Sequence, residues 1–233
     1  MQPSANDGKE LTTKVDGVDY QRIPIKTKVV MAGDDLDAIV REAAEPVLEP
    51  GDILFVTEKI VAISQGRSYP IDEIQPRKLA VTLSKYVVKT PYGIGLGMPE
   101  TMEMALRECG TPRILLAAGV AAVTKAFGRK GDFYRIAGSK ARGIDGPTSG
   151  TIPPYNSQVV LTPAEPDKVA ARLKALFGGK ADVLVVDMND IGGNILGTTL
   201  GHKRDDEMVA ILSDNPLGQG HQSTPLGVIR KAV

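Results

Sequence analysis

Residues 181–201 constrain the fold of this chain more than any other segment, because they place oxygen-bearing side chains directly after an apolar run. Five of the seven residues from Ala181 to Asp187 are apolar. A run this short and this rich in β-branched side chains is typical of a buried strand rather than a helix. The polar and glycine residues that end the run are Asp187, Asn189, Asp190, Gly192, Gly193 and Gly197.

These residue types predict a loop that holds a divalent cation beside a phosphate. Carboxylate and amide oxygens are ligands that Mg²⁺ and Mn²⁺ prefer, and a glycine-lined loop lets the backbone approach a phosphate closely. The same residue types also cap helices and form turns in proteins without any such site. The segment alone therefore leaves both interpretations open.

The composition favours a globular protein and argues against two classes of partner. A chain of 233 residues is long enough to bury a core as one large domain or two small ones. Its 28 basic and 28 acidic side chains leave no net charge, so the overall charge attracts neither nucleic acid nor an anionic membrane. Aromatic residues make up 4% of the chain, which argues against base stacking on single-stranded nucleic acid.

The cysteine content and the apolar runs predict a cytoplasmic protein. The single cysteine, Cys109, allows neither a disulfide framework nor a CxxC metal site. The polar N-terminus lacks the basic and apolar regions of a signal peptide. The longest apolar run, at 114–123, has ten residues, about half of what a membrane-spanning helix needs. We therefore expect a soluble protein without a membrane anchor.

Periodicity predicts a mixture of strands and helices preceded by a polar tail. Residues 1–18 have little apolar periodicity, so we expect a mobile tail and then one domain, possibly of two lobes, over 19–233. Short apolar runs predict strands at 21–26, 52–57, 114–118, 133–136, 158–161 and 181–186. Spacings of three and four predict helices at 34–47, 77–88, 99–109 and 166–177.

Two charged segments allow both a functional and an ordinary interpretation. Lys59 follows a predicted buried strand, where a cation commonly contacts phosphate, although a solvated lysine is the simpler interpretation. Six cations between residues 125 and 142 lead to Asp145 and suit a phosphorylated or carboxylated substrate, and a solvated hairpin explains them equally well. The two histidines, His202 and His221, belong to no hydrolase or metalloprotease motif.

Five short motifs follow one another between residues 33 and 230. They are Gly-Asp-Asp-Leu at 33–36, Gly-Asp-Ile-Leu-Phe-Val-Thr-Glu-Lys-Ile-Val at 51–61 with Gly-Arg at 66–67, Gly-Ile-Asp at 143–145, Val-Val-Asp at 185–187, and Thr-Pro-Leu-Gly-Val-Ile-Arg at 224–230. In this order they resemble the coenzyme F420-0 gamma-glutamyl ligase family. The resemblance extends over about residues 21–233.

The resemblance implies a fold and an activity. Members of the family are GTP-dependent ligases that use Mg²⁺ or Mn²⁺ to join the amino group of L-glutamate to the carboxylate of a deazaflavin phosphodiester. Their fold is α+β, with two lobes and mixed and antiparallel sheets. They form an intertwined homodimer with the nucleotide near its interface.

The resemblance also assigns site residues by position. Asp145 and Asp187 match the metal-binding carboxylates of the family and are therefore the catalytic candidates. The residues implied to line the nucleotide are Pro24, Glu58, Lys59, Gly218, Gln219, Gly220 and His221.

The chain departs from the family pattern at three places, one of which is a longer loop at 146–156. Ile63 stands where the family usually has a nucleotide-contacting lysine. After Asp187 the family usually continues Thr-x-Gly-Arg, whereas this chain continues with Met188, so a metal-side threonine and an arginine are missing. Oxygens of Asn189, Asp190 or Gln219 are candidate substitutes as metal ligands.

The expected function is thus a metal- and nucleotide-dependent amide ligase. It would join an amino acid, glutamate by resemblance, to a small-molecule carboxylate acceptor through an acyl phosphate, with GTP or ATP as cosubstrate. Deazaflavin, folate-like and other acceptors remain open. The alternative is a non-catalytic nucleotide- or metabolite-binding protein on the same fold.

Overall fold

The computed structural model describes residues 3–87, 95–129, 131–148, 150–190, 192–218 and 222–232. The chain divides into two compact units. Unit 1 combines the N-terminal residues up to Gly66 with Pro163–Val233, and unit 2 is the intervening segment Arg67–Thr162. The chain therefore passes between the units twice, at residues 66–67 and 162–163.

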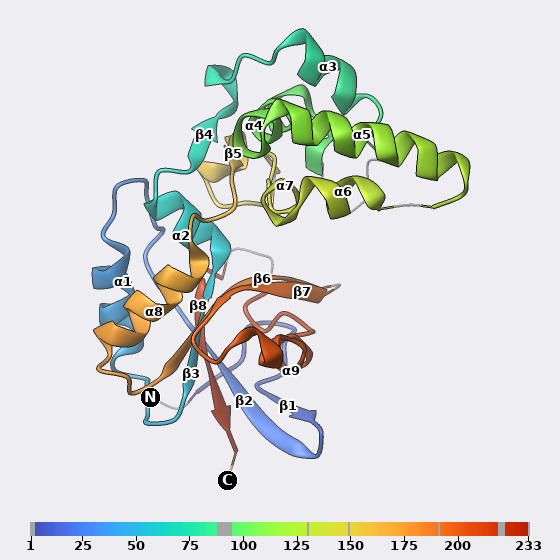
Figure 1. Cartoon of the computed structure of the whole chain (residues 1–233). Coiled ribbons are helices and arrows are strands. Elements are labelled where there is room, and N and C mark those ends of the chain that lie inside the picture. Colours follow the sequence, from blue (N-terminus) through green and yellow to red (C-terminus); the bar gives the residue numbers. More distant parts are fainter. Residues whose placement is uncertain are drawn as a thin grey trace. The chain divides into compact units, whose positions relative to one another are not determined.

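Unit 1 is built on a sheet of six strands in the order β1-β2-β8-β3-β6-β7 (Figure 1). The strands are β1 Thr12–Val15, β2 Val18–Ile25, β3 Ile53–Thr57, β6 Asp182–Asn189, β7 Gly192–Thr198 and β8 Leu226–Lys231. β3 and β6 are parallel, and every other neighbouring pair is antiparallel. The sheet is therefore mixed, with the two most apolar strands side by side.

Helices cover both faces of this sheet, as Figure 1 shows. One face packs on α9 Asp205–Ile211 through a core that includes Phe55, Leu184 and Ile229. The other face carries α1 Leu36–Ala44, α2 Glu58–Ser64 and α8 Pro166–Leu176. Both faces are buried, which explains why β3 and β6 are continuous apolar runs without alternation.

Local signals in the sequence fix the helices of unit 1. The carboxylate of Asp35 accepts hydrogen bonds from the backbone N–H groups of Asp37 and Ala38, at 3.0 and 3.2 Å, and so caps α1. Pro166 begins α8, where its missing N–H costs nothing, and Gly178 follows the helix with φ of 60°. These two predicted helices are confirmed.

Unit 2 is mainly helical, with a two-stranded antiparallel sheet of β4 and β5. Its elements are β4 Ser68–Pro70, η1 Ile71–Glu73, α3 Lys78–Ser84, η2 Gly95–Gly97, α4 Pro99–Cys109, α5 Thr111–Ala126, α6 Asp132–Ala137, α7 Ser139–Arg142, η3 Tyr155–Ser157 and β5 Gln158–Val160. Its core contains Met102, Ile114 and Ile144, each no more than 1% exposed. Unit 2 thus has a core of its own.

Two predicted strands of unit 2 are wrong. Residues 114–118 lie inside α5, a helix of 16 residues that begins with Pro112 in its first turn. Residues 133–136 lie inside α6, which glycines with positive φ bound at both ends, Gly131 and Gly138. In both cases a short apolar run fitted strand and helix equally well, and packing decided the outcome.

Structure in unit 1 also begins earlier than Tyr20. β1 pairs with β2 through a turn at Asp16 and Gly17, whose φ values are 49° and 82°. An Asp-Gly pair between two strands is a strong hairpin signal, because the type I′ turn needs positive φ at both positions. The first strand therefore lies within the segment predicted as a tail.

The α+β fold class is confirmed by this arrangement. Within the residues that the structure describes, no helix is both long enough and apolar enough to span a membrane.

Candidate functional site

One edge of the six-stranded sheet gathers most of the site residues predicted in unit 1. Because β3 and β6 are parallel and Thr57 pairs with Val186, the next residues of both strands, Glu58 and Asp187, emerge at the same edge. The carboxyl ends of parallel strands are the usual place for a ligand in such sheets. Lys59 follows Glu58 in the first turn of α2.

The neighbouring strands bring two further segments to this edge. β8 begins here, since Ile25 and Val56 both pair with Leu226, and the Thr57 N–H donates to the Pro225 carbonyl at 3.0 Å. Pro24 pairs with Gly227 one step inside the edge. The chain segment that leads into β8 therefore closes the edge between β2 and β3.

Strand alternation determines which way the polar end of β6 faces. Leu184, Val186 and Met188 pack toward α9, so Asp187 and Asn189 belong to the opposite face, which α2 and α8 cover. Glu58 begins α2 on that face and is 7% exposed. A buried carboxylate, a lysine and the two oxygen-bearing side chains of β6 thus share one corner of unit 1.

The glycine segment after β6 is a strand, β7, and not the predicted glycine-lined loop. Its glycines serve close packing. A Cβ on Gly197 would lie 2.3 Å from the Pro166 carbonyl carbon, and one on Gly193 would lie 2.3 Å from the Asp187 carbonyl oxygen. At both positions the backbone approaches other protein backbone, which only glycine allows.

The N-terminal segment contributes contacts that the sequence analysis missed. The ammonium of Lys9 donates to Asp190 Oδ1 at 2.8 Å and to the Asp214 carbonyl at 2.6 Å. The side-chain amide of Asn6 donates to the carbonyls of Pro216 and Leu217. No local pattern in residues 3–10 marks these contacts, because each partner lies more than 180 residues away.

Asp190 therefore forms an ion pair with Lys9. Gly218 belongs to a tight turn. The Gly218 N–H donates to the Asn215 carbonyl at 2.9 Å, and Gly218 has φ of 73°. The other predicted nucleotide-loop residues, Gln219, Gly220 and His221, lie outside the described residues.

Asp145 belongs to unit 2. Its backbone N–H and carbonyl pair with Val160, both at 2.9 Å, so that it extends the β4–β5 sheet. It follows Ile144, which is buried in the core of that unit. The structure brings Asp187, Asn189, Glu58, Lys59 and Pro24 to one sheet edge, while Asp145 has its place in the other unit.

The basic segment before Asp145 is helical and much of its charge is neutralised within unit 2. Arg129 and Arg135 contact the buried carboxylate of Asp132 at 3.3 and 3.1 Å. Lys140 contacts Glu108 at 3.2 Å, and Arg67 contacts the same carboxylate at 2.7 Å. The solvated hairpin, one of the two interpretations left open, is wrong, because residues 132–142 form α6 and α7.

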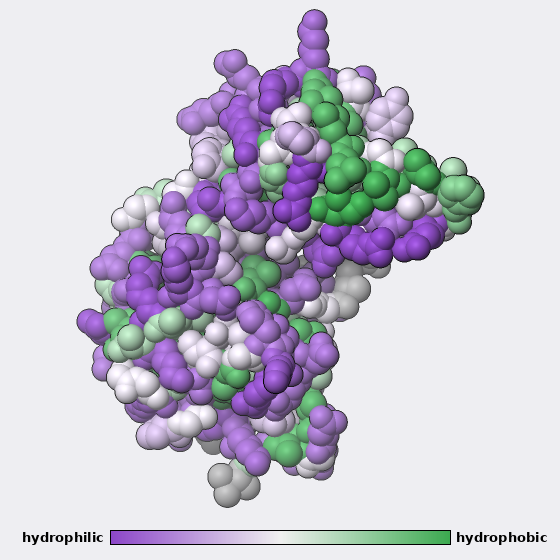
Figure 2. Space-filling view, in the orientation of Figure 1, coloured by the Kyte–Doolittle hydropathy of each residue, from purple (hydrophilic) through white to green (hydrophobic). Residues whose placement is uncertain are grey.

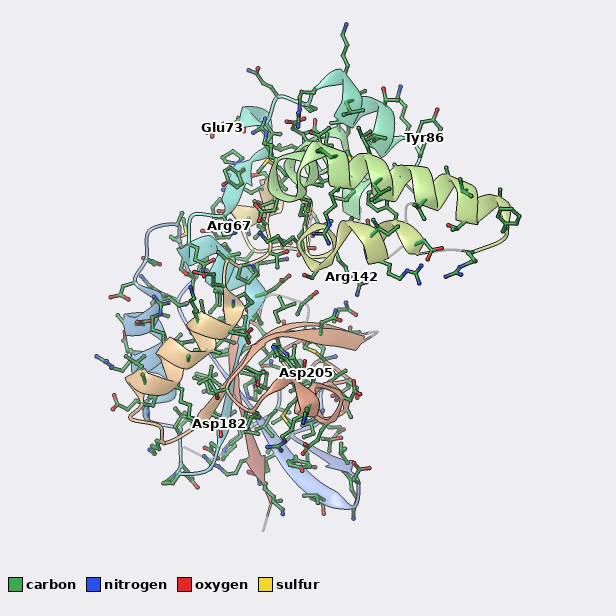
Figure 3. The ribbon with its side chains drawn as sticks, in the orientation of Figure 1. Arg67, Glu73, Tyr86, Arg142, Asp182 and Asp205 are labelled. Atoms are coloured by element: carbon green, nitrogen blue, oxygen red, sulfur yellow. The ribbon has the colours of Figure 1, made fainter. Side chains whose placement is uncertain are left out.

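These contacts change the ionisation of Glu108. Partial burial raises the pKa of this carboxyl, but the hydrogen bonds and positive charges of Arg67 and Lys140 outweigh burial, so that the net pKa lies below its ordinary value. Glu108 therefore stays ionised and fixes the two cations. Arg142, which ends α7, is exposed (Figure 3).

The chemistry of the candidate metal ligands suits a hard divalent cation. Asp187 and Asn189 offer a carboxylate and an amide oxygen from one face of a strand. Among the described residues, no cluster of three or more His, Cys, Asp or Glu side chains forms a ready metal site. A cation held here would need oxygens from water or phosphate to complete its coordination.

Comparison with known proteins supports the family resemblance. The family model F420-0:Gamma-glutamyl ligase matches residues 24–199. A curated relative, the coenzyme F420:L-glutamate ligase of Methanopyrus kandleri, is 28% identical over 169 residues, which cover 71% of this chain and 57% of the relative. The chain thus matches little more than half the length of this relative. Because the family model covers most of the sequence, from Pro24 through the last residues of β7, this chain belongs to the F420-0:gamma-glutamyl ligase family.

Proposed function

We propose that this chain is an amide ligase that joins L-glutamate to a carboxylate acceptor at the expense of a nucleoside triphosphate. One observation carries the proposal. The register of β3 against β6 places Glu58, Lys59 and Asp187 at one sheet edge, inside the segment that matches the family. The curated relative is named a coenzyme F420:L-glutamate ligase, which makes a deazaflavin the first acceptor to test.

The proposed reaction has two steps. A carboxylate oxygen of the acceptor attacks the γ-phosphorus, the bond to the nucleoside diphosphate breaks, and an acyl phosphate forms. The amino nitrogen of glutamate then attacks the acyl carbon, an amide bond forms, and phosphate leaves as the amine loses its proton. Both steps place negative charge on phosphoryl oxygens, which positive groups at fixed positions stabilise.

The residues of the sheet edge have complementary roles in this proposal. Lys59 would orient a phosphate, and Asp187 with Asn189 would hold Mg²⁺ or Mn²⁺. Such an ion, when bound, supplies positive charge to the phosphoryl oxygens. GTP is the first cosubstrate to test and ATP the second.

A direct assay tests the proposal. The purified chain is incubated with Mg²⁺, GTP or ATP, L-glutamate and the deazaflavin phosphodiester, and phosphate and the amide product are measured. We expect phosphate release only when both glutamate and acceptor are present. Asp187→Asn should abolish it, whereas Asp206→Asn, an exposed change on α9, should leave it intact. Full turnover by Asp187→Asn would contradict the proposal.

A second candidate function is nucleotide or metabolite binding without turnover. It is favoured by Ile63 and Met188, which replace polar residues of the family pattern. Ile63 is only 3% exposed, and Met188 packs against the core on the α9 side of the sheet. This candidate predicts that nucleotide binds in calorimetry while no acceptor supports phosphate release. The first candidate predicts binding and release together.

We further propose that the chain forms a homodimer through α5. Three apolar side chains of this helix are exposed, namely Leu115 at 45% and Leu116 and Val123 at 60%, and Phe127, just after the helix, is 80% exposed. Figure 2 shows apolar residues gathered along α5. Exposed apolar surface of this kind is typical of protein contacts, and a second copy offers the same surface in return.

A further inference from the structure

The N-terminal segment from Pro3 to Glu10 is tied to two parts of the candidate site. Lys9 links Asp190, beyond the end of β6, to the Asp214 carbonyl, in the loop after α9. Asn6 Nδ2 lies 2.9 Å from the Leu217 carbonyl and 2.8 Å from Thr224 Oγ1. A segment expected to be a free tail thus contacts both sides of the loop that contains Gly218.

The ammonium of Lys9 is well placed to act as a fixed cation. Its side chain is 17% exposed, and two of its three N–H donors are used by Asp190 and the Asp214 carbonyl. Hydrogen bonds between ionised partners are about twice as strong as neutral ones. Asp190 therefore has a cation supplied by the protein itself.

Asn215 continues the connection from Asp190 to the glycine loop. Its side chain is buried, and its Nδ2 atom lies 3.5 Å from Asp190 Oδ1 and 3.1 Å from the Gly218 carbonyl. Lys9, Asp190, Asn215 and Gly218 thus form one chain of polar contacts. On this path two residues, Asp190 and Asn215, connect Lys9 to Gly218.

A buried arginine fixes the C-terminal end of the segment. Arg22 of β2 is 2% exposed and donates to the carbonyls of Glu10 and Thr12, at 2.7 and 3.1 Å. The same guanidinium contacts Asp214 and the Ile211 carbonyl. Arg22 therefore holds the N-terminal segment and the loop after α9 against each other.

We infer that residues 3–10 form an intramolecular strap that sets the conformation of the loop 214–218, with Lys9 as the positioning residue and Asp190 as its anchor. Lys9, Asp214 and Gly218 lie outside the segment that matches the family, 24–199, whereas Asp190 lies inside it, so the strap connects the matched segment to residues on both sides of it. The assignment of this loop to the nucleotide rests on the proposed function, whereas the strap itself does not.

Hydrogen–deuterium exchange on the full chain tests the strap without any ligand. The amides of Asn215 and Gly218 are the reporters, because they donate to the carbonyls of Leu212 and Asn215. Lys9→Met removes the ammonium and keeps the length of the side chain, and we expect at least about tenfold faster exchange at both amides. Lys9→Arg should restore slow exchange. Unchanged exchange in Lys9→Met would overturn the inference.

Two further variants make the result specific. Asp190→Asn removes the charge at the other end of the contact and should raise the exchange rate as much as Lys9→Met does. The double variant should exchange no faster than either single variant. Lys14→Met is the matched control, because Lys14 is 64% exposed and its contact with Asp19 is long, at 3.8 Å. It should leave both amides unchanged. If Lys14→Met accelerated amide exchange equally, the effect would follow from the loss of any positive charge, and this would contradict the strap.

Kinetics separate the strap from the proposed ligase function. If the chain turns over, Lys9→Met should raise the KM for the nucleotide several-fold more than it lowers kcat, and Lys9→Arg should recover most of the loss. If no acceptor supports turnover, the exchange result still decides whether the strap exists. A fall in kcat at unchanged KM would exclude a role in positioning the nucleotide loop.

Discussion

Gly197 of β7 lies directly against the backbone of Pro166 at the start of α8, with room for no side chain between them. A Cβ at this position would be 2.3 Å from both the carbonyl carbon and oxygen of Pro166. The Thr198 N–H donates to Asp167 Oδ1 at 3.0 Å and fixes the same junction. Close approach of strand and helix backbones therefore holds α8 on the sheet.

Gly197→Ala should destabilise the protein by about 1–3 kcal/mol, because the helix must move away from the strand. Urea unfolding followed by circular dichroism measures the loss. Gly119→Ala is the control, since Gly119 lies in α5 with nothing within 4 Å of a Cβ, and alanine favours a helix there. Equal stability of the two variants would contradict the packing role of Gly197.

Acid should weaken unit 2 through Glu103. Burial raises the pKa of this carboxyl, but hydrogen bonds from Arg77 and Arg107 outweigh it, and the net pKa lies below its ordinary value. Its stabilising contribution is present above the ordinary carboxyl pKa and is lost as the pH falls through the lowered value. Urea unfolding between pH 7 and pH 3 measures this dependence.

The matching variant is Glu103→Gln, which keeps the shape of the side chain and removes its charge. We expect it to cost roughly 1–3 kcal/mol at neutral pH, because two arginines lose their buried carboxylate, and to flatten the acid dependence. Glu73→Gln, at an exposed position of the same unit (Figure 3), should change neither property. A steep acid dependence that persists in Glu103→Gln would contradict this assignment.

His202 should contribute to stability in the opposite direction. The hydrogen bond with Asp205 at 2.7 Å raises the pKa of this imidazole most, partial burial opposes it, and Asp167 at 3.3 Å raises it further. The contribution of the protonated ring is complete below the ordinary histidine pKa, about 6.5, and is lost as the pH rises through the raised value.

Proton NMR of the His202 ring measures this pKa directly. Asp205→Asn removes the largest cause and should shift the titration midpoint toward its ordinary value. Asp206→Asn, one residue further along α9, should leave the midpoint almost unchanged. A midpoint at or below the ordinary value in the unaltered chain would show that the two carboxylates do not stabilise the protonated imidazole.

The proposed homodimer predicts a change of mass. Leu116→Glu combined with Val123→Glu places two charges on the exposed face of α5, which should convert a dimer to a monomer in light scattering. Lys78→Glu, on the exposed side of α3, should leave the mass unchanged. A monomer in the unaltered chain at micromolar concentration would contradict this interface.

The sequence predicts those elements whose signals are local. The run after Ala181 and the Pro166 start of α8 each carry their own signal, and both elements form as expected. The strand predicted at 114–118 was wrong, because a short apolar run suits a strand and a buried helix face alike, although Pro112 is a local signal for a helix start. In the folded protein Ile114 belongs to that helix and is buried in the core of unit 2.

The sequence predicted those residues of the candidate site that directly follow a strand. Glu58 and Asp187 follow apolar runs, and the parallel pairing of those runs brings them to one edge. Lys9 gave no signal, because its partners Asp190 and Asp214 are distant in sequence and ordinary in type. Two glycines also misled the interpretation, since a close approach to protein backbone and one to a phosphate look alike in sequence.

The first and last residues of unit 2 lie close together, and this has a consequence for how the unit could be deleted or exchanged. The Leu161 N–H donates to the Arg67 carbonyl at 2.9 Å, and the Gln65 side chain is bonded to the backbone of Ala164. All six strands of the large sheet lie outside the insertion. The helical segment is therefore a removable cassette, which a short linker could replace, or a relative's cassette could supplant, without cutting a single strand of the sheet.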